Sequence, residues 1–335
     1  MAKFYFDEDA DLSALEGSLV GIIGYGNQGR SQALNLRDSG ITPLIGNLDD
    51  AYAEQARKDG FDPRPIPEVA GRANAVFLLI PDEVQPQVYR DMIHAHLKPG
   101  NLLCFAHGYN IQFGFIEPPA FVDVVMIAPR MLGRGVREAF VKGVGFPSLI
   151  AVQQDYSQKA LVRTLALSKG IGSTRMGVLM SSFEEETVID LLGEHQPALY
   201  ALRAEYEALV EAGYSPEAIL LDLYASGESA VWAQAAADLG SFDRMKLASH
   251  TAQFGHLVWA QRQFDPERTR ERLRTMIQDI KSGIFTREWT EEQRTGLVRL
   301  QQVWAQNRAH PMMEAEERLY RILGRRRIPA KKTVR

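Results

Sequence analysis

The sequence predicts a doubly wound α/β domain followed by an all-helical domain. In the first part of the chain, short apolar runs of strand length alternate with longer helix-like stretches. After about residue 181 the strand signal ends, and the strong helix formers Ala, Leu, Glu, Gln and Arg dominate. We therefore expect a parallel sheet with helices on both faces at 1–181, a helical domain at 182–328 and a basic tail at 329–335.

The expected strands are continuous apolar runs at 19–24, 75–80, 102–106 and 124–128. Continuous rather than alternating runs are typical of strands that are covered on both faces, as in a parallel sheet between helices. In the helical part, the glycine-containing stretches 213–216 and 240–243 predict that one helix ends and the next one is capped.

The composition narrows the class of protein. The chain has 335 residues, of which 45% are hydrophobic and 24% charged, which is close to the globular average. No apolar run approaches the roughly 18 residues of a membrane span, and a net charge of −4 argues against nucleic-acid binding. The single cysteine, Cys104, and an acidic N-terminus without signal-peptide features predict a cytoplasmic protein. Its partner is therefore expected to be a small-molecule substrate.

A glycine loop follows the first expected strand. It is a G-x-G-x-x-G pattern, made by Gly24, Tyr25, Gly26, Asn27, Gln28 and Gly29. Such glycines allow a tight turn and let a pyrophosphate approach the backbone at a helix N-terminus. Because a strand precedes the pattern and a helical stretch at 31–37 follows it, a dinucleotide site is favoured over a purely structural turn.

The end of the second strand predicts which dinucleotide binds. An acidic side chain about 20 residues beyond the loop bonds the ribose hydroxyls of NAD, whereas arginine suits the 2′-phosphate of NADP. Asp49 and Asp50 stand there, and no arginine or lysine follows before Arg57. NADH is therefore expected in preference to NADPH. The alternative is that the two aspartates only cap the following helix.

Several segments, in order and spacing, resemble ketol-acid reductoisomerase of the short form. They lie at 24–29, 33–40, 79–85, 105–114, 127–130, 149–152, 169–172 and 185–194, with weaker matches at 209–214 and 278–283. The resemblance implies an NAD(P)H- and Mg²⁺-dependent enzyme of branched-chain amino-acid biosynthesis. It would shift an alkyl group in a 2-hydroxy-2-acyl acid and then reduce the resulting ketone. It also implies a Rossmann-like first domain and a knotted helical domain that forms a homodimer or higher homo-oligomer.

The resemblance also assigns site residues. The matched coenzyme positions are Tyr25 to Gln28, Asp82, Glu83, Val84, Gln85 and Gly133. His107 matches the active-site histidine of the family, and Asp190 and Glu194 match two of its four metal carboxylates. The spacing i, i+4 puts both carboxylates on one helix face, where oxygen ligands suit Mg²⁺. Without the resemblance, such a pair of carboxylates more often lies on a solvent-exposed helix face than at a metal site. A single histidine is likewise more often a hydrogen-bonded polar residue than a catalytic one.

Three departures from the family pattern bear on the function. The second pair of metal glutamates is replaced by Asp222 and Ser226, so one Mg²⁺ site is expected and a second is doubtful. Arg130 replaces the active-site lysine, and residues 131–133 replace a Gly-Pro-Gly sequence. The stretch between residues 194 and 214 is also shorter by about one helical turn. Ser249 matches the substrate serine of the family, and Ser226 is a further candidate substrate contact.

The departures affect the two half-reactions unequally. Alkyl migration depends on two cations that bind adjacent oxygens, whereas hydride transfer needs a bound nicotinamide and a charge stabiliser. We therefore expect a reductase for a small 2-keto acid or related imine, with His107 and Arg130 as catalytic residues and a lost or weak isomerase step. The alternatives are a complete Mg²⁺-dependent reductoisomerase and a nucleotide-binding protein without turnover.

Overall fold

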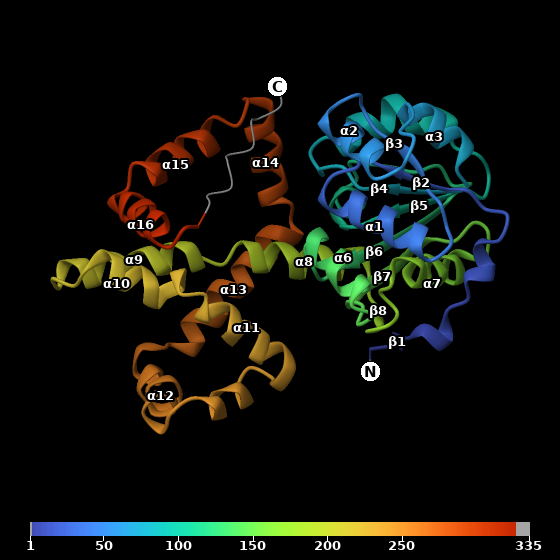
Figure 1. The fold of residues 1–335 in the computed structure, drawn as a ribbon. Coiled ribbons are helices and arrows are strands. Elements are labelled where there is room, and N and C mark those ends of the chain that lie inside the picture. Colours follow the sequence, from blue (N-terminus) through green and yellow to red (C-terminus); the bar gives the residue numbers. More distant parts are fainter. Residues whose placement is uncertain (1, 326–335) are drawn as a thin grey trace. The chain divides into compact units, whose positions relative to one another are not determined.

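The chain forms two compact units, Met1–Leu191 and Leu192–Arg335 (Figure 1). The computed structural model describes residues 2–325, and the predicted tail at 329–335 lies outside them. The sequence places the domain boundary at 181/182, where helix α8 (Phe183–Glu194) is about to begin. The compact unit extends to residue 191 because the first turn of α8 contributes Phe183 to its core.

The first unit is built on an eight-stranded sheet with the order β1-β8-β7-β6-β5-β4-β2-β3. The strands are β1 (Phe4–Tyr5), β2 (Val20–Ile23), β3 (Leu44–Gly46), β4 (Ala75–Leu78), β5 (Leu102–Phe105), β6 (Asp123–Pro129), β7 (Ser148–Gln154) and β8 (Val178–Met180). The five strands β3-β2-β4-β5-β6 are all parallel, as predicted. The parallel pairing aligns their carboxyl ends, where α/β sheets bind ligands.

The sheet is mixed rather than wholly parallel. Strand β7 is antiparallel to β6, and β1 is antiparallel to β8. Between β6 and β7 lies α6 (Gly133–Val141), which leaves and rejoins the sheet at the same edge. The Arg130 amide donates a hydrogen bond to the Pro147 carbonyl over 3.0 Å, which joins the two ends of this excursion. The next strand must therefore run back along β6.

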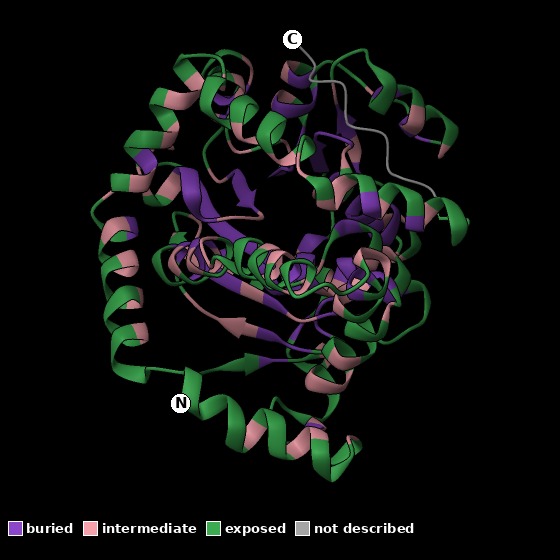
Figure 2. Cartoon of the chain, turned by 90° about the vertical axis from the view of Figure 1, so that its left-hand side faces the viewer, coloured by how far each residue is buried: buried purple, intermediate pink, exposed green. Residues whose placement is uncertain are grey.

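Both faces of the sheet are covered, which confirms the doubly wound prediction. All residues of β2, β4, β5 and β6 are buried, and Figure 2 shows buried strands beside outer ones that are partly exposed. Successive residues serve opposite cores: Ile22 and Phe77 belong to one apolar cluster, and Ile23 and Leu78 to the other. The first cluster contains residues of α1 (Asn27–Asp38), α2 (Ala51–Lys58), α6 and α7 (Ala160–Ile171). The second contains residues of α3 (Ile66–Arg72) and η3 (Tyr89–Ile93). The short helices are η1 (Asp7–Asp9), η2 (Leu12–Leu15), α4 (Gln85–Val88), η4 (His94–His96) and α5 (Tyr109–Gln112).

The second unit is helical throughout its described residues. Its helices are α9 (Ala198–Glu211), α10 (Pro216–Leu220), η5 (Leu221–Ala225), α11 (Glu228–Leu239), η6 (Asp243–Leu247), α12 (His250–Phe254), η7 (Gly255–Trp259), η8 (Ala260–Gln263), α13 (Pro266–Lys281), α14 (Ile284–Arg294), α15 (Val298–Arg308) and α16 (Pro311–Ile322). The predicted interruptions are confirmed. The hydroxyl of Ser215 accepts a hydrogen bond from the Ala218 amide and caps α10, and α11 ends at Leu239 before η6 begins at Asp243.

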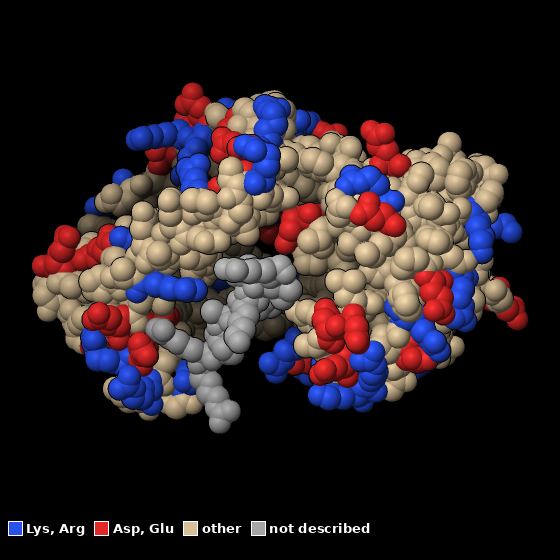
Figure 3. Space-filling model, turned by 90° about the horizontal axis from the view of Figure 1, so that it is seen from above, with Lys and Arg blue, Asp and Glu red and all other residues tan. Residues whose placement is uncertain are grey.

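The core of the helical unit is small. Its cluster of buried hydrophobic residues consists of Tyr206, Ile219, Leu220, Ala225, Ala315 and Leu319, within the described part of the chain. Large apolar side chains on the same unit are exposed, among them Leu199, Phe242 and Trp304. Among residues 2–325, no helix combines the length and the apolar content needed to cross a membrane. On the face seen in Figure 3, basic and acidic side chains are interspersed, so that face carries no extended patch of one sign.

Candidate active site

The glycine loop lies where β2 ends and α1 begins. Gly24 has a φ of +95°, and a Cβ there would come within 2.8 Å of the Leu79 carbonyl. A Cβ on Gly29 would come within 2.0 Å of the Gly24 carbonyl. Gly26 differs, because a Cβ there would meet nothing within 4 Å. Gly24 and Gly29 are thus required by the turn itself, whereas Gly26 leaves open the space that a pyrophosphate would occupy.

Tyr25 supports this loop from behind. Its side chain is buried, and its hydroxyl donates a hydrogen bond to Asp59 Oδ2 over 3.0 Å. Arg30 binds the same carboxylate through two nitrogens, at 2.6 and 3.0 Å. Burial, with the hydrogen bond to Asp59, raises the pKa of Tyr25 above its ordinary value. The buried side chain of Tyr25 therefore anchors the glycine loop through its hydroxyl. Its partner Asp59 was not predicted from the sequence.

The segment that carries Arg130 also contacts the glycine loop. Gln28 Nε2 donates a hydrogen bond to the Met131 carbonyl over 2.9 Å. A Cβ on Gly133 would lie 2.0 Å from the Asn27 carbonyl, so the first residue of α6 must be glycine for α6 to approach α1 this closely. Asn27, Gln28 and Gly133 are thus brought together, and their coenzyme role stays a prediction.

The two aspartates after β3 have different environments. Asp50 is the N-cap of α2, where it accepts hydrogen bonds from the amides of Tyr52 and Ala53. Asp49 is 86% exposed and pairs with Arg57 over 2.9 Å. A cavity of about 340 Å³ lies here, and its lining includes Asn47, Leu48, Asp49, Arg57 and Arg64. Helix α2 and the loop after it thus place Arg57 and Arg64 at this cavity, whereas the prediction from sequence took Arg57 to be too far along the chain and did not consider Arg64.

Asp82 and Gln85 form hydrogen bonds with residues of the segment that follows β5. The Nδ1–H of His107 donates a hydrogen bond to Asp82 Oδ2 over 2.6 Å. Gln85 is buried and donates to the Ile80 carbonyl, and its side-chain oxygen accepts a hydrogen bond from Asn110. Glu83 and Val84 are exposed between them. Of the four predicted coenzyme positions, Asp82 is therefore the one that orients His107.

His107, Arg130, Glu186 and Asp190 form one polar cluster, which we call the carboxylate cluster. His107 follows β5, Arg130 follows β6, and the two acids lie one turn apart on α8. Arg130 donates from Nη2 to Glu186 Oε1 over 2.7 Å and from Nη1 to Asp190 Oδ1 over 2.8 Å. The Nε2 atom of His107 lies 3.7 Å from Asp190 Oδ2 and 4.0 Å from Glu186 Oε2.

Glu186 is the residue of this cluster that sequence reasoning missed. Its side chain is fully buried, and its second oxygen accepts a hydrogen bond from the Gly108 amide over 2.8 Å. Burial raises the pKa of Glu186, against the opposing influence of His107, Gly108 and Arg130. A signal was available: Glu186 precedes Asp190 by four residues, which is the same i, i+4 spacing that singled out Asp190 and Glu194.

The electrostatics of the cluster favour a charged histidine. Burial alone would lower the pKa of His107, but its hydrogen bond to Asp82 and the charges of Asp82, Glu186 and Asp190 raise it to about 9. The Nε2 atom is buried and has no hydrogen-bond partner among the described residues. A histidine held in this way can donate a proton or a hydrogen bond to a ligand oxygen at neutral pH.

The cluster fits a divalent cation in part. One ligand atom from each of His107, Glu186 and Asp190 lies within 4.8 Å of the others, and carboxylate oxygens are the ligands that Mg²⁺ prefers. Glu194 lies one turn beyond Asp190 on α8, so the helix presents both acids along one side. The Nε2 atom of His107, which has no hydrogen-bond partner among the described residues, lies near Asp190 and is available to a ligand bound there. The residues present therefore fit a divalent cation at His107, Glu186 and Asp190, with Arg130 as a neighbouring cation, and the metal role of Glu194 stays a prediction.

The remaining predicted residues belong to the helical unit. Asp222 is exposed within η5, a π-helical segment of a kind that is frequent at functional sites. The Ser226 hydroxyl accepts a hydrogen bond from the Glu228 amide over 3.2 Å. Ser249 caps α12 by accepting from the Ala252 amide over 3.3 Å. Each serine is exposed and has a local structural partner, so their roles as substrate contacts stay predictions.

Fold and site together define a dinucleotide-dependent oxidoreductase with a carboxylate cluster beside its coenzyme loop. Two family models match the chain: "Acetohydroxy acid isomeroreductase, NADPH-binding domain" over residues 14–177 and "Ketol-acid reductoisomerase, C-terminal domain" over 183–324. The chain belongs to the ketol-acid reductoisomerase family, as the sequence resemblance indicated.

Known relatives match along almost the whole chain. A ketol-acid reductoisomerase (NADP(+)) of Methanopyrus kandleri is 42% identical over 97% of this chain and 99% of the relative. The enzyme of the same name from Pyrobaculum calidifontis is 40% identical over 96% and 99%. A solved structure, of an NADH-preferring ketol-acid reductoisomerase from an uncultured archaean, has a TM-score of 0.89 at 34% identity and covers 96% of this chain and 99% of that one. A pyrroline-5-carboxylate reductase from Streptococcus pyogenes, at 16% identity and a TM-score of 0.51, shares the fold alone.

Proposed function

We propose that the chain catalyses both half-reactions of a Mg²⁺-dependent ketol-acid reductoisomerase. The observation that carries this proposal is the cluster of His107, Glu186 and Asp190, whose ligand atoms lie within 4.8 Å of one another at the carboxyl edge of the sheet. The near full-length identity to enzymes of that name supports both steps rather than reduction alone. The substrate is then a 2-hydroxy-2-acyl acid, and the product a dihydroxy acid of branched-chain amino-acid biosynthesis.

The residues of the chain divide the chemistry between them. When bound at Asp190 and Glu194, Mg²⁺ would polarise the oxygens of the substrate. His107, oriented by Asp82 and protonated at neutral pH, donates from Nε2 to the oxygen on which negative charge develops. The glycine loop would hold the pyrophosphate of the coenzyme at the N-terminus of α1. Arg130 neutralises the buried charge of Glu186.

A second candidate is a reductase with a weak isomerase step, which the sequence departures favour. Two observations support it: Arg130 already holds Asp190 and Glu186, and Ser226 offers a neutral hydroxyl where the family has a carboxylate. Under this alternative the second cation is weakly held or absent. The chain then reduces a ready-made 2-keto acid without rearranging a precursor.

The two candidates are separated by supplying each half-reaction with its own substrate. Coenzyme oxidation is followed with acetolactate, which requires rearrangement, and with the rearranged 2-keto acid, which requires reduction alone. Oxidation with both, dependent on Mg²⁺, is expected. Oxidation with the keto acid only would select the reductase, and tight coenzyme binding without any turnover would select a nucleotide-binding protein.

NADH is proposed as the preferred coenzyme. A 2′-phosphate needs an arginine that is free to bind it, and both arginines of the 340 Å³ cavity are paired with carboxylates, Arg57 with Asp49 and Arg64 with Asp62. Asp49 and its charge stand beside the place where the phosphate would lie. The similar structure named as NADH-preferring is consistent with this preference, whereas the relatives above are named for NADP(+).

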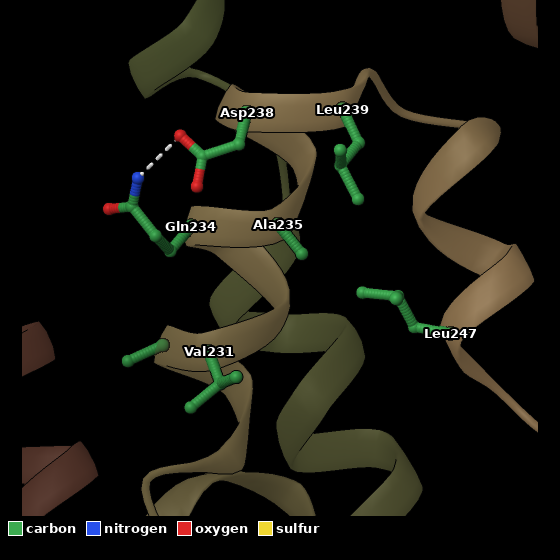
Figure 4. A pocket seen from close by; sticks show the side chains of 7 residues that line it. Val231, Gln234, Ala235, Asp238, Leu239 and Leu247 are labelled. Atoms are coloured by element: carbon green, nitrogen blue, oxygen red, sulfur yellow. Dashed lines mark hydrogen bonds between the residues drawn. The ribbon is translucent and has the colours of Figure 1, made fainter.

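A homodimer or larger homo-oligomer is proposed through the helical unit. Among the described residues, a cluster of six buried hydrophobic side chains is a small core for a unit of this length, so much of its apolar surface needs a partner. An open cavity of about 510 Å³ is lined by Ala230, Val231, Gln234, Ala235, Asp238, Leu239 and Leu247. Figure 4 shows apolar side chains of α11 and η6 directed into it, while Gln234 and Asp238 pair at its edge. The occupant proposed for this surface is a second copy of the chain.

A further inference from the structure

Arg130 spans two carboxylates with two different nitrogens. Its Nη2 lies 2.7 Å from Glu186 Oε1, and its Nη1 lies 2.8 Å from Asp190 Oδ1. A third donor, Nε, reaches the Ala128 carbonyl over 3.3 Å. Because each carboxylate is held by its own N–H groups, one of the two ion pairs can be broken while the other stays intact.

The two carboxylates differ in how easily they can exchange partners. Glu186 is fully buried, and loss of its cation would leave an unpaired charge in the protein interior. The side chain of Asp190 is 31% exposed, so solvent or an ion can replace the arginine there. The contact that can open is therefore the one between Arg130 Nη1 and Asp190.

A cation that binds Asp190 competes with this contact. Asp190 Oδ1 already accepts a hydrogen bond from Arg130, and Oδ2 faces His107 Nε2 at 3.7 Å. A divalent ion gains full access to the carboxylate only when the guanidinium withdraws from Oδ1. The side chain of Arg130 is itself 31% exposed, which leaves it room to move toward solvent while Nη2 remains with Glu186.

We propose that the Arg130 guanidinium is a tethered cation that occupies Asp190 in the metal-free enzyme and sets the threshold for Mg²⁺ binding. It closes on Asp190 when the divalent ion is absent, and it releases Asp190 but keeps Glu186 when the ion binds. This inference rests on the proposed use of Asp190 as a cation ligand. It explains what an arginine adds at a position where the family carries lysine, because a single ammonium cannot bind the two carboxylates through separate, fixed nitrogens.

The test measures Mg²⁺ binding directly, by isothermal titration calorimetry on the full-length, chelator-treated protein without coenzyme or substrate. The substitution Arg130→Lys keeps the charge and removes the fork, and we expect it to tighten Mg²⁺ binding by about tenfold. Arg134→Lys is the matched control, because Arg134 pairs with Glu138 on its own helix and with no other acidic residue in the described part of the chain. The affinity of this variant for Mg²⁺ should equal that of the wild type. Asp190→Asn should abolish binding in both backgrounds.

Thermal unfolding gives a second readout. In chelator, Arg130→Lys should unfold at a lower temperature than the wild type, and saturating Mg²⁺ should close this gap, since a ligand stabilises the state to which it binds. If Arg130→Lys does not fold, Arg130→Gln replaces it, because its planar amide can still donate to Glu186.

Equal Mg²⁺ affinity of wild type and Arg130→Lys, within twofold, would overturn the inference, and so would binding that survives Asp190→Asn. The proposed function is judged separately, by turnover of acetolactate. Tighter binding in a protein that does not rearrange acetolactate supports the tethered cation and rejects the complete reductoisomerase, whereas equal affinity in an active enzyme does the reverse.

Discussion

At the scale of single residues, the hydrogen bond between His107 and Asp82 controls the charge of the site. The pKa of His107 rises to about 9 in the folded protein, compared with an ordinary value of 6.5. The folded protein therefore binds a proton that the unfolded chain releases between these two values. A raised histidine pKa contributes stability that is complete below about pH 6.5 and is lost as the pH rises through about 9.

The free energy of unfolding should accordingly fall by roughly 3 kcal/mol between pH 6.5 and pH 9.5 through this one group. Urea unfolding across that range measures it, and His107→Gln should flatten the profile. His310, which pairs with Glu207 in the helical unit, gives the control substitution His310→Gln, which should leave the His107 component in place. A wild-type profile as flat as that of His107→Gln would refute the assignment.

A second residue-scale prediction concerns the coenzyme. Asp49→Asn removes the partner of Arg57 at the 340 Å³ cavity and makes this guanidinium available to a 2′-phosphate. The ratio of kcat/KM for NADPH to that for NADH should rise by about tenfold, the value of one charge-assisted contact. Asp62→Asn, which releases Arg64, is the parallel variant. An unchanged ratio in both would show that neither arginine reaches the coenzyme.

At the scale of elements, the strands were predictable and the direction of the outer ones was not. The runs that form β2, β4, β5 and β6 are apolar throughout because both of their faces are buried. The reversal at β7 depends on where α6 rejoins the sheet, which is a tertiary property without a local signal. For Glu186 the sequence offered its i, i+4 spacing to Asp190, but its burial and its contact with Gly108 arise only when α8 packs on the loop after β5.

The glycine loop gives a matched pair of element-scale substitutions. Gly26→Ala places its methyl group in open space within the protein, so the unfolding temperature should stay within about 1–2 °C of wild type. The methyl group should nevertheless weaken NADH binding at least tenfold, because it blocks the approach of the pyrophosphate to the backbone.

Gly29→Ala is the contrasting variant. Its methyl group would lie 2.0 Å from the Gly24 carbonyl, so both stability and NADH affinity should fall. Calorimetric titration with NADH and thermal unfolding, run on the two variants side by side, measure both quantities. The assignment of the loop fails if Gly26→Ala binds NADH as tightly as the wild type.

At the scale of the whole molecule, the two units differ in how much apolar surface each buries. The sheet unit has two extended clusters, whereas the helical unit has one cluster of six buried hydrophobic residues among those described and leaves Leu199, Phe242 and Trp304 exposed. Composition predicted the helices, since helix formers dominate after residue 181. Composition could not predict that the hydrophobic core of the helical unit is small, because the size of the core depends on which helix faces pack against each other.

We therefore expect the unfolding temperature to rise with protein concentration, as it does when association stabilises the folded state. Leu239→Asp, at the 510 Å³ cavity, should shift the molecule toward the monomer in analytical ultracentrifugation and remove the concentration dependence. Val162→Asp, at an exposed apolar position on α7 of the other unit, is the control. A monomeric wild type at micromolar concentration would exclude the proposed assembly.

The link between Gln28 and the Met131 carbonyl has a consequence for the order of events during turnover. Met131 adjoins Arg130 in the chain, so we expect a shift of the glycine loop on binding NADH to alter the position of the guanidinium as well. If the guanidinium responds in this way, thermodynamic reciprocity requires that coenzyme and metal ion alter each other's affinity by the same factor. Occupancy of the coenzyme site would then change the occupancy of the metal site at a given concentration of Mg²⁺.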